Sequence, residues 1–417
     1  MVVNSMSYAT YDSYKESGVD WLGAIPSDWE LGRISAFFSE RRQKVSDKDY
    51  PALSVTKLGV FPQWENVAKS NDGDNRKLVK KGDFVINSRS DRKGSSGIAK
   101  QDGSVSLINI VLKPVNIEPR YSEYLFKSYN FIEEFYRVGH GIVADLWTTR
   151  FDDIKNSMIA LPTFDEQVKI ANFLDDKTVQ IDQAIALKQQ QIEKLNEYKQ
   201  IVIQNAVTKG LNPNVPMKDS GVEWIGDIPE HWDVKKLKYV LKSYNKKISS
   251  RNSDLRYLGM ENIISKTGEI NNESAEVEGL ANHFKPNHIL FGKLRPYLAK
   301  VYLADFEGIC STEFLVFEVL EPNNAKFLQI LLLSNGFIQN IDSSTYGSKM
   351  PRANPDFINN QFIAIPPLDE QLQIINAIEN KNQPIKQAIE KYQTQIDRLK
   401  EYKNILINQA VTGKIKI

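Results

Sequence analysis

Cysteine and histidine are scarce in this sequence, and their scarcity excludes several kinds of chemistry. Cys310 is the only cysteine among 417 residues, so an intramolecular disulfide is impossible and a reducing compartment is expected. The four histidines have neither metal-ligand spacing nor cysteine partners; they are His140, His231, His283 and His288. We therefore expect no metal site and assign the histidines to packing or surface positions.

Net charge and long apolar runs are also missing. The chain has 53 Lys and Arg against 52 Asp and Glu, so its formal charge of +1 gives no overall attraction for polyanions. Any contact with nucleic acid has to come from local patches. The N-terminus lacks a basic region followed by an apolar core, and no window approaches about 18 uninterrupted apolar residues. We expect a cytoplasmic protein without a membrane partner.

Catalytic motifs are absent as well. No GxxxxGK[ST] phosphate loop and no glycine-rich dinucleotide turn occurs. "NPDF", from Asn354, resembles a tetrapeptide of amino-methyltransferases, but Asp356 stands where that motif has proline, and we interpret it as a turn. "EYK", at Glu197 and Glu401, has the E-x-K form of nucleases but lies within a predicted helix. "GSSGIA", from Gly94, lacks the partners of a nucleophile. The sequence thus offers no catalytic residues.

The sequence does contain an internal duplication. "GVDWLGAIPSDW", residues 18–29, returns as "GVEWIGDIPEHW", residues 221–232. A longer segment that begins at Pro162 returns without a gap from Pro366, at an offset of about 204 positions and with roughly half of its residues identical. About 130 divergent residues lie between the two repeated parts of each half. The chain is a tandem pair, and the Pro- and Asn-rich "LNPNVP" separates its halves.

The longer repeated segments are predicted to be helices. Asp165 and Asp369 follow proline-containing turns and place negative charge at the positive end of a helix dipole. Apolar residues then alternate at spacings of four and three, which is a heptad pattern, at Ile181, Ile185, Ile192, Leu195, Val202, Ile385, Ile389, Tyr392, Ile396, Leu399 and Leu406. Because both copies share this period, we expect the two helices to pair. The alternative is that each helix packs on the core of its own domain.

Lysines and one proline interrupt this heptad seam. Lys188, Lys199 and Lys403 fall on it, and we expect their stems to pack while their ammonium groups reach water. Pro384 lies inside the second copy and is expected to break or restart the helix there.

The divergent blocks are predicted to be mixed α/β. β-Branched and aromatic content indicates strands within residues 82–89, 104–115, 288–294 and 313–320. Apolar periodicity indicates helices within residues 121–139 and 323–341. The order is the same in both halves, and each block ends in a short apolar strand before "ALP" or "AIPP". We infer one scaffold that presents two different readers.

Each block also carries basic, polar loops after a predicted strand. The first loop, "SRSDRKGSSG" (residues 88–97), matches in position "FGKLRPYLAK" (residues 291–300) of the second block. Later, "VGHGIVADLW" (138–147) and "YGSKMPR" (346–352) occupy equivalent places before the final strand. Arg and Lys neutralise phosphates or bind guanine, and serines bond base edges. Such loops can also be merely solvated, but their matched placement favours nucleic-acid contact.

Together these segments resemble one family, the specificity (S) subunits of type I restriction-modification systems. The resemblance rests on "SGVDWLGAIPSDW" and "SGVEWIGDIPEHW", on "LPTFDEQ" and "IPPLDEQ", and on "NEYKQIVIQNAVTKG" and "KEYKNILINQAVTGK", with an unlike block inside each set. "GKLRPYL" in the second block is also typical of the family. The resemblance covers the chain from about residue 17 onward.

The resemblance implies an α+β fold: two mixed α/β target recognition domains, joined by two long helices that form an antiparallel coiled coil, with an internal pseudo-twofold repeat. It divides the chain into an unassigned N-terminal extension (1–16), target recognition domain 1 (17–162), scaffold helix 1 (163–210), a linker (211–217), target recognition domain 2 (218–366) and scaffold helix 2 (367–417). The dodecamer then leads into each recognition domain and ties a strand to a helix through its tryptophans.

The implied function is DNA recognition within a larger complex. Each domain would read one half of an asymmetric bipartite site on double-stranded DNA, and the helices would set the gap, since about 27 helical residues span roughly 40 Å against about 34–36 Å for one turn of DNA. Two modification subunits would dock on the helices and methylate adenine, and restriction subunits would join them. S-adenosylmethionine, ATP and Mg are expected on these partners, so the chain itself would be a non-catalytic subunit without a cofactor.

On this basis we expect the loop side chains to contact DNA. They are Arg89, Arg92, Lys93, Ser95 and Ser96 for the first half-site, Lys293, Arg295 and Tyr297 for the second, and Tyr346, Lys349 and Arg352 from the later loop. Two alternatives stay open. A divergent fused methyltransferase or nuclease would bind S-adenosylmethionine or a divalent metal unaided, and a coiled-coil adaptor would show no salt-dependent affinity for DNA.

Overall fold

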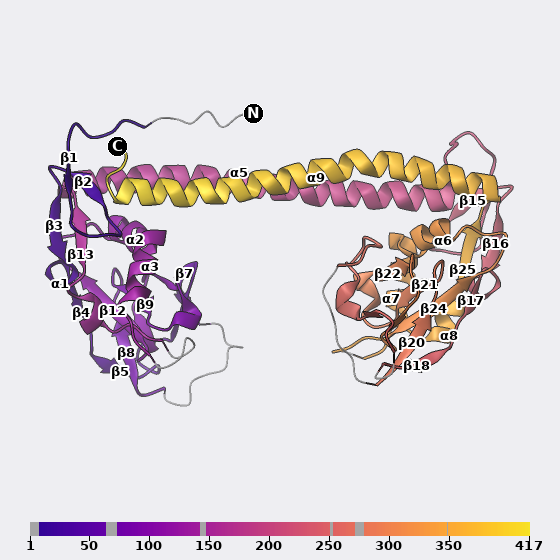
Figure 1. The fold of residues 1–417 in the computed structure, drawn as a ribbon, viewed down its shortest axis with the longest axis horizontal. Coiled ribbons are helices and arrows are strands. Elements are labelled where there is room, and N and C mark those ends of the chain that lie inside the picture. Colours follow the sequence, from indigo (N-terminus) through magenta and orange to yellow (C-terminus); the bar gives the residue numbers. More distant parts are fainter. Residues whose placement is uncertain (1–7, 64–72, 142–146, 251–252, 272–278, 348) are drawn as a thin grey trace. The chain divides into compact units, whose positions relative to one another are not determined.

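The computed structural model describes residues 8–63, 73–141, 147–250, 253–271, 279–347 and 349–417. The chain forms two compact units. Unit 1 comprises residues 1–188 and 394–417, and unit 2 comprises residues 189–393. Each unit contains one of the divergent blocks and parts of both long helices (Figure 1).

Unit 1 is built mainly from short antiparallel strands around two apolar clusters. A hairpin of β1 (Tyr14–Glu16) and β2 (Ala24–Pro26) is followed by β3 (Glu30–Arg33), which pairs with β13 (Met158–Leu161). A four-stranded sheet has the order β10 (Ser96–Ile98), β9 (Phe84–Asn87), β12 (Asn109–Pro114) and β4 (Phe38–Glu40). The other strands are β11 (Gly103–Ser106), β8 (Arg76–Val79), β5 (Lys44–Val45), β6 (Leu53–Thr56) and β7 (Gly59–Pro62), and the short helices are α1 (Ile34–Phe37), α2 (Pro119–Lys127), α3 (Tyr129–Arg137) and α4 (Phe151–Ile154).

Unit 2 repeats this plan. Its hairpin consists of β14 (Met217–Asp219) and β15 (Asp227–Pro229), and β16 (Asp233–Lys236) pairs with β25 (Phe362–Ile365). One four-stranded sheet has the order β17 (Leu241–Ser243), β24 (Phe314–Val319), β21 (Ile289–Gly292) and β22 (Val301–Leu303). The second has the order β18 (Lys247–Ser249), β20 (Leu280–Phe284), β23 (Gly308–Cys310) and β19 (Tyr257–Leu258), and the short helices are α6 (Ala325–Leu332), α7 (Asn335–Ser343) and α8 (Pro355–Asn359).

The strand register places the two units in correspondence, residue by residue. In unit 1, Leu112 of β12 faces both Glu40 and Phe84. In unit 2, Phe317 of β24 faces Ser243 and Ile289 in the same way. Glu40 and Ser243 therefore occupy one structural position, although the surrounding sequences are unlike.

Each long helix predicted inside the divergent blocks is in fact two helices. In unit 1 the break falls at Ser128, whose hydroxyl donates to the Leu125 carbonyl at 2.7 Å and accepts from the Phe131 N–H at 3.4 Å. In unit 2 it falls at Ser334, which precedes α7. Apolar periodicity continues through both positions, so the prediction missed a serine that ends one helix and begins the next.

The two long repeats form α5 (Phe164–Lys209) and α9 (Leu368–Val411), which pack against each other in antiparallel order (Figure 1). Within unit 1, Lys403 of α9 forms an ion pair with Asp182 of α5 at 2.7 Å. Within unit 2, apolar residues near the C-terminal end of α5 share a core with those near the start of α9. The predicted α+β class, with two paired long helices and a duplicated plan, is thereby confirmed.

Pro384 does not break α9, which is where the prediction is wrong. A proline removes one backbone hydrogen bond, whereas Ile378 and Ile385 on either side of it are buried and hold the helix in place.

The predicted seam residues lie on the covered side of both helices. Ile181, Ile385, Ile396 and Leu406 are buried, and Ile185, Ile192, Leu195, Val202, Ile389, Tyr392 and Leu399 are half-buried.

The repeated "DEQ" motif attaches each block to its long helix. The Gln167 side chain donates to the Pro162 carbonyl at 3.0 Å and accepts from the Glu118 N–H at 2.9 Å, just before α2. Gln371 makes the same pair of bonds, to the Pro366 carbonyl at 3.0 Å and from the Asn324 N–H at 2.8 Å, just before α6. Both glutamines are buried. A buried backbone group without a partner is costly, so this amide fixes where the short helix begins.

The dodecamer supplies the turn and the second strand of a hairpin that packs against the end of a long helix. Its last residue, Trp29 in unit 1 and Trp232 in unit 2, is fully buried in the core of its unit. A Cβ on Gly413, just after α9, would collide with Pro26, and a Cβ on Gly210, just after α5, would lie 3.2 Å from the Trp232 ring. Gly413 and Gly210 have positive φ, 70° and 71°. This left-handed conformation ends each helix where the chain meets the hairpin.

The N-terminal segment has a counterpart that the sequence did not reveal. β1 (Tyr14–Glu16) pairs with β2 as β14 (Met217–Asp219) pairs with β15, so the residues before the dodecamer correspond to the end of the linker region. Tyr8 packs edge-on against Phe173 of α5, with ring centroids 5.5 Å apart, and its hydroxyl lies 3.2 Å from that of Tyr402.

No helix in the described residues has a stretch both long and apolar enough to cross a lipid bilayer.

Candidate nucleic-acid interface

In each unit the two candidate loops lie together. In unit 1 the Ser90 N–H donates to the Trp147 carbonyl at 3.0 Å, and the Thr149 N–H donates to the Ser88 carbonyl at 3.0 Å. In unit 2 the Arg295 N–H donates to the Pro351 carbonyl at 2.7 Å, and the Ala353 N–H donates to the Lys293 carbonyl at 2.9 Å. Loops about 50 residues apart in sequence thus form one surface, and the same surface is built twice. Residues 142–146 of the later loop in unit 1 lie outside the described residues.

The predicted cations of unit 1 lie on a 3₁₀ turn, Ser90–Arg92, directly after β9. Asp91 lies 3.3 Å from Arg89 and 3.7 Å from Arg92, whose side chain is 68% exposed. Lys93 forms an ion pair with Glu133 at 2.7 Å, and its ammonium lies 5.8 Å from the centre of the Tyr136 ring. Exposed ion pairs of this kind are weak, so a phosphate or a base can displace Asp91 or Glu133 at small cost.

Ser95 and Ser96 do not lie on this surface. Both are buried, with 5% and 1% of the residue exposed, because β10 begins at Ser96 and pairs with β9. The sequence placed them in an open Ser/Gly loop, but the edge strand turns them into the domain. Their hydroxyls are therefore out of reach of DNA in this conformation, and we do not include them in the interface.

The predicted residues of unit 2 surround a strained turn. Arg295 and Ala299 flank a 3₁₀ turn, Pro296–Leu298, and both adopt positive φ, 50° and 45°, which costs energy in residues other than glycine. The Tyr297 side chain projects from this turn and is 45% exposed. Lys293 donates to the Thr312 carbonyl at 2.8 Å. The turn holds its aromatic and cationic side chains at the surface.

The later loop of unit 2 adds three more side chains. Tyr346 is 66% exposed and Lys349 is exposed. Arg352 is held by both carboxylate oxygens of Glu313, at 3.0 and 3.1 Å, and this hydrogen bonding raises the pKa of the guanidinium. Arg352 is thus fixed in orientation, whereas Tyr346 and Lys349 remain open to a ligand.

Unit 1 also contains a pocket beside the paired loops that the sequence did not single out. Its volume is about 520 Å³, and its lining includes Ser88 of the first loop and Thr148, Thr149 and Arg150, which directly follow the second. Charged side chains complete the polar lining, namely Glu40, Arg42, Lys44, Lys77 and Asp152. The signal in the sequence was the basic run "RRQK", residues 41–44, directly after a strand, which is short enough to be read as solvated surface.

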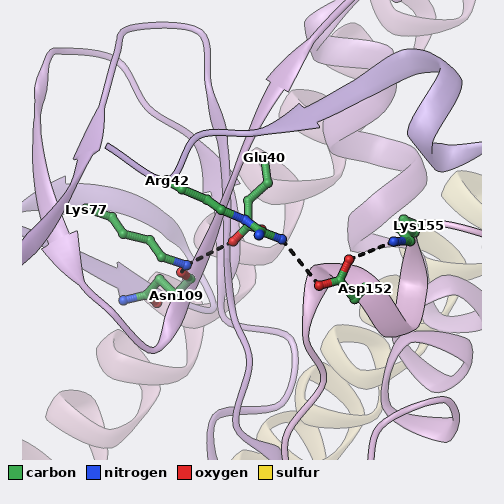
Figure 2. A network of polar contacts seen from close by, with 6 residues as sticks. All are labelled: Glu40, Arg42, Lys77, Asn109, Asp152 and Lys155. Atoms are coloured by element: carbon green, nitrogen blue, oxygen red, sulfur yellow. Dashed lines mark hydrogen bonds and ion pairs between the residues drawn. The ribbon is translucent and has the colours of Figure 1, made fainter. Parts of the chain in front are cut away.

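A charged network connects these pocket residues (Figure 2). Arg42 bonds Glu40 at 2.6 Å and Asp152 at 3.3 Å. Lys77 bonds Glu40 at 3.0 Å, and Lys155 bonds Asp152 at 2.7 Å. The described residues hold no group of three or more His, Cys, Asp or Glu that could bind a metal ion.

Comparison with known proteins agrees with this architecture. The profile of the type I restriction modification DNA specificity domain matches the chain twice, at residues 26–197 and 229–401. The chain is similar to the type I restriction enzyme MjaVIII specificity subunit of Methanocaldococcus jannaschii, with 26% identity over 94% of each chain. It is also similar to the EcoDI specificity subunit of Escherichia coli, with 23% identity over 86% of this chain and 82% of that one.

A solved structure shares the fold. It comes from work on complex assembly and conformational transition of the type I R-M system, and it superimposes with a TM-score of 0.66 over 93% of this chain and 98% of that one, at 12% identity. The family assignment rules out the divergent methyltransferase or nuclease, because its members are non-catalytic subunits. With two copies of the specificity domain and paired long helices, the chain belongs to the family of type I restriction-modification specificity subunits.

Proposed function

We propose that this chain reads a bipartite, asymmetric site on double-stranded DNA, with the paired loops of each unit reading one half. The observation that carries the proposal is the repetition of one loop arrangement with unlike side chains. The backbone bonds between the loops recur in both units, whereas the side chains differ. Unit 1 has the exposed Arg92 with the half-buried Arg89 and Lys93, and unit 2 has the exposed Tyr297 and Lys349 with the half-buried Arg295. Two readers built alike but equipped differently fit two unlike half-sites.

The proposal includes the boundaries of the domains and helices. Residues 17–162 and 218–366 are the two target recognition domains, residues 163–210 and 367–417 are the scaffold helices, and residues 211–217 are the linker. α5 and α9 set the spacer between the half-sites. Each helical residue added or removed changes the helix length by about 1.5 Å and so changes the distance between the attached domains. Exposed apolar residues along α5, such as Tyr198 and Ile201, support the docking of partner subunits there.

The partners follow from the same proposal. Two modification subunits bind the helices and use S-adenosylmethionine to methylate adenine, and restriction subunits supply translocation and cleavage with ATP and Mg. This chain contributes specificity and holds none of these cofactors. The similar structure from a study of type I complex assembly supports such a complex.

Methylation mapping tests the proposal directly. The chain is expressed with its modification subunit in a host that lacks restriction-modification systems, and the methylated positions of the genome are mapped by single-molecule sequencing. We expect a new motif of two unlike half-sites, separated by a fixed spacer and carrying N6-methyladenine. A complex that assembles without producing any new motif would sink the proposal. The modification subunit expressed alone is the control.

A further inference from the structure

The charged pocket of unit 1 adjoins the loops that carry the proposed function. Ser88 begins the first loop, and Thr148 and Thr149 directly follow the second, so the pocket adjoins the paired loops. The charged lining of the pocket includes Glu40, the last residue of β4, and Arg42 two residues later. A ligand on the loops therefore lies beside these side chains.

Arg42 is fixed in direction yet open to a ligand. Its Nε bonds Glu40 at 2.6 Å and its Nη2 bonds Asp152 at 3.3 Å, while its side chain stays 64% exposed. Figure 2 shows the guanidinium held between the two carboxylates. Among the described residues no partner is found for Nη1. A guanidinium held in this way presents its remaining donors without losing side-chain freedom on binding.

Glu40 and Asp152 are fixed in turn by lysines. Lys77 donates to Glu40 at 3.0 Å and to the Asn109 carbonyl at 2.8 Å, and Lys155 donates to Asp152 at 2.7 Å. Each carboxylate is thus shared between Arg42 and one lysine. The carboxylates stabilise Arg42 in one orientation, as supporting residues do for the reading side chain of a binding site.

The charged lining offers donors and acceptors together, as a base pair does. Its cations are Arg42, Lys44, Lys77 and Arg150, and its carboxylates are Glu40 and Asp152. Guanine offers O6 and N7 as a pair of acceptors to an arginine, and this is the commonest specific contact in the major groove.

Unit 2 has the same backbone position with different chemistry. Because Glu40 corresponds to Ser243 in register, Arg42 corresponds to Asn245. Lys77 pairs with Lys44 across neighbouring strands of unit 1, and Asn282 pairs with Lys247 in the same way in unit 2. Lys77 therefore corresponds to Asn282. The Asn282 amide donates to the Phe314 carbonyl at 2.9 Å, just as Lys77 donates to that of Asn109. Glu40, Arg42 and Lys77 of unit 1 are thus replaced by the uncharged Ser243, Asn245 and Asn282 in unit 2 without a change of fold, as a change of base preference requires.

We propose that Arg42 is a base-reading residue of the first recognition domain, that it binds the O6 and N7 of a guanine in the first half-site, and that Glu40 and Asp152 position it. This inference rests on the proposed function and adds a residue to its DNA contacts. Asn245 holds the same place for the second half-site.

Motif mapping with four variants tests the inference in the assembled complex. Arg42→Ala and Arg42→Lys should relax one G·C position of the first half-site by roughly 5- to 150-fold and leave the second half-site unchanged. Arg42→Lys keeps the positive charge but lacks the planar guanidinium. A loss of base selection in this variant therefore separates base reading from the attraction of a charge to DNA. Asn245→Ala is the matched control and should alter only the second half-site. Asp152→Asn should weaken selection at the same G·C position as Arg42→Ala.

Other outcomes overturn the inference in distinguishable ways. An unchanged first half-site in both Arg42 variants removes Arg42 from recognition. A uniform loss on all DNA, with the slope of log K against log salt reduced by about 0.9, would make Arg42 a phosphate contact. If the unaltered chain itself yields no bipartite motif, the proposed function fails first. Thermal unfolding of each complex verifies that the variants assemble.

Discussion

The two units of this chain share their attachment to the long helices and differ at the surface that we propose for DNA. Gln167 and Gln371 make the same two hydrogen bonds, and Trp29 and Trp232 fill the same place in the core. Near the loops, unit 1 has a network of ion pairs, whereas unit 2 has a strained turn and the ion pair of Arg352 with Glu313. The duplicated chain has kept what holds a reader in place and changed what the reader presents.

The difference extends into the domain interior. In unit 1, Arg41 forms an ion pair with the buried Asp83 at 2.7 Å. At the same place in unit 2 the Tyr244 ring packs on His288, with centroids 4.6 Å apart, and the Tyr244 hydroxyl lies 3.1 Å from His283. One backbone position therefore tolerates either a charged pair or an aromatic contact, provided that each buried polar group has a partner.

The largest expected effect tests the shared core. Trp29→Ala and Trp232→Ala each remove a fully buried side chain and should each lower the free energy of unfolding of the affected unit by about 3–5 kcal/mol. Hydrogen exchange of the full chain, measured separately for each unit, gives the two values. Tyr129→Ala, at a residue 65% exposed, is the control and should cost less than about 0.5 kcal/mol. Unequal losses for the two tryptophans would break the comparison.

The shared glutamines come next. Gln167→Leu and Gln371→Leu each leave a backbone carbonyl and a backbone N–H without their partner, so each should destabilise its unit by roughly 2–4 kcal/mol. Chemical denaturation of the full chain, followed by exchange at α2 and α6, reports the loss. Gln373→Leu, on an exposed face of α9, is the matched control and should have little effect. A mild effect of Gln371→Leu would mean that water replaces the amide.

A recognition variant sharpens the comparison on the side where the units differ. Arg295→Ala removes a cation from the turn of unit 2 and leaves its backbone conformation in place. It should relax recognition of the second half-site alone by about 1–3 kcal/mol, because a bidentate contact to a base is worth that much. Competition binding with DNA altered in one half-site at a time measures it. Equal loss at both half-sites would refute the assignment of unit 2 to one half of the site.

The smallest effect concerns pH. Burial lowers the pKa of His288 from its ordinary value of 6.5; the nearby Glu318 opposes this effect, and His283 and Lys285 add to it. Below about pH 6.5 the unfolded chain therefore binds a proton that folded unit 2 does not, and the stability of unit 2 falls as the pH falls. Hydrogen exchange at pH 7.5 and 5.5 should show this loss for unit 2. His288→Asn should reduce it, and an unchanged pH response in that variant would assign the effect elsewhere.

Much of the fold was predictable because the two copies of the duplication can be compared with each other. A repeat at a constant offset identifies the halves. The predicted bounds lie within one residue of both observed ends of α5 and of the start of α9, whereas α9 ends at Val411, six residues before the predicted end at 417. Pattern alone misplaced other features. It joined α2 to α3 across Ser128, and it broke α9 at Pro384 although buried neighbours hold that helix together.

The candidate site was only partly predictable. Residue type and position after a strand identified the loops of Arg89 and Arg295, because both signals are local. Burial of Ser95 and Ser96 depends on the pairing of β10 with β9, which no local pattern expresses. The charged pocket depends on Arg42 and Asp152, which are 110 residues apart in sequence and meet only in the folded unit.

The sequence by itself determined that the chain is two related halves, that each half ends in a long amphipathic helix, and that catalytic motifs are missing, because repeats, periodicity and motifs are local properties of the chain. Only the tertiary structure decided which loops pair, which serines are buried, and how Glu40 and Asp152 come to hold Arg42. Those features arise from strand register and from contacts between distant segments, which burial and hydrogen-bond satisfaction select among many arrangements that the sequence pattern alone permits.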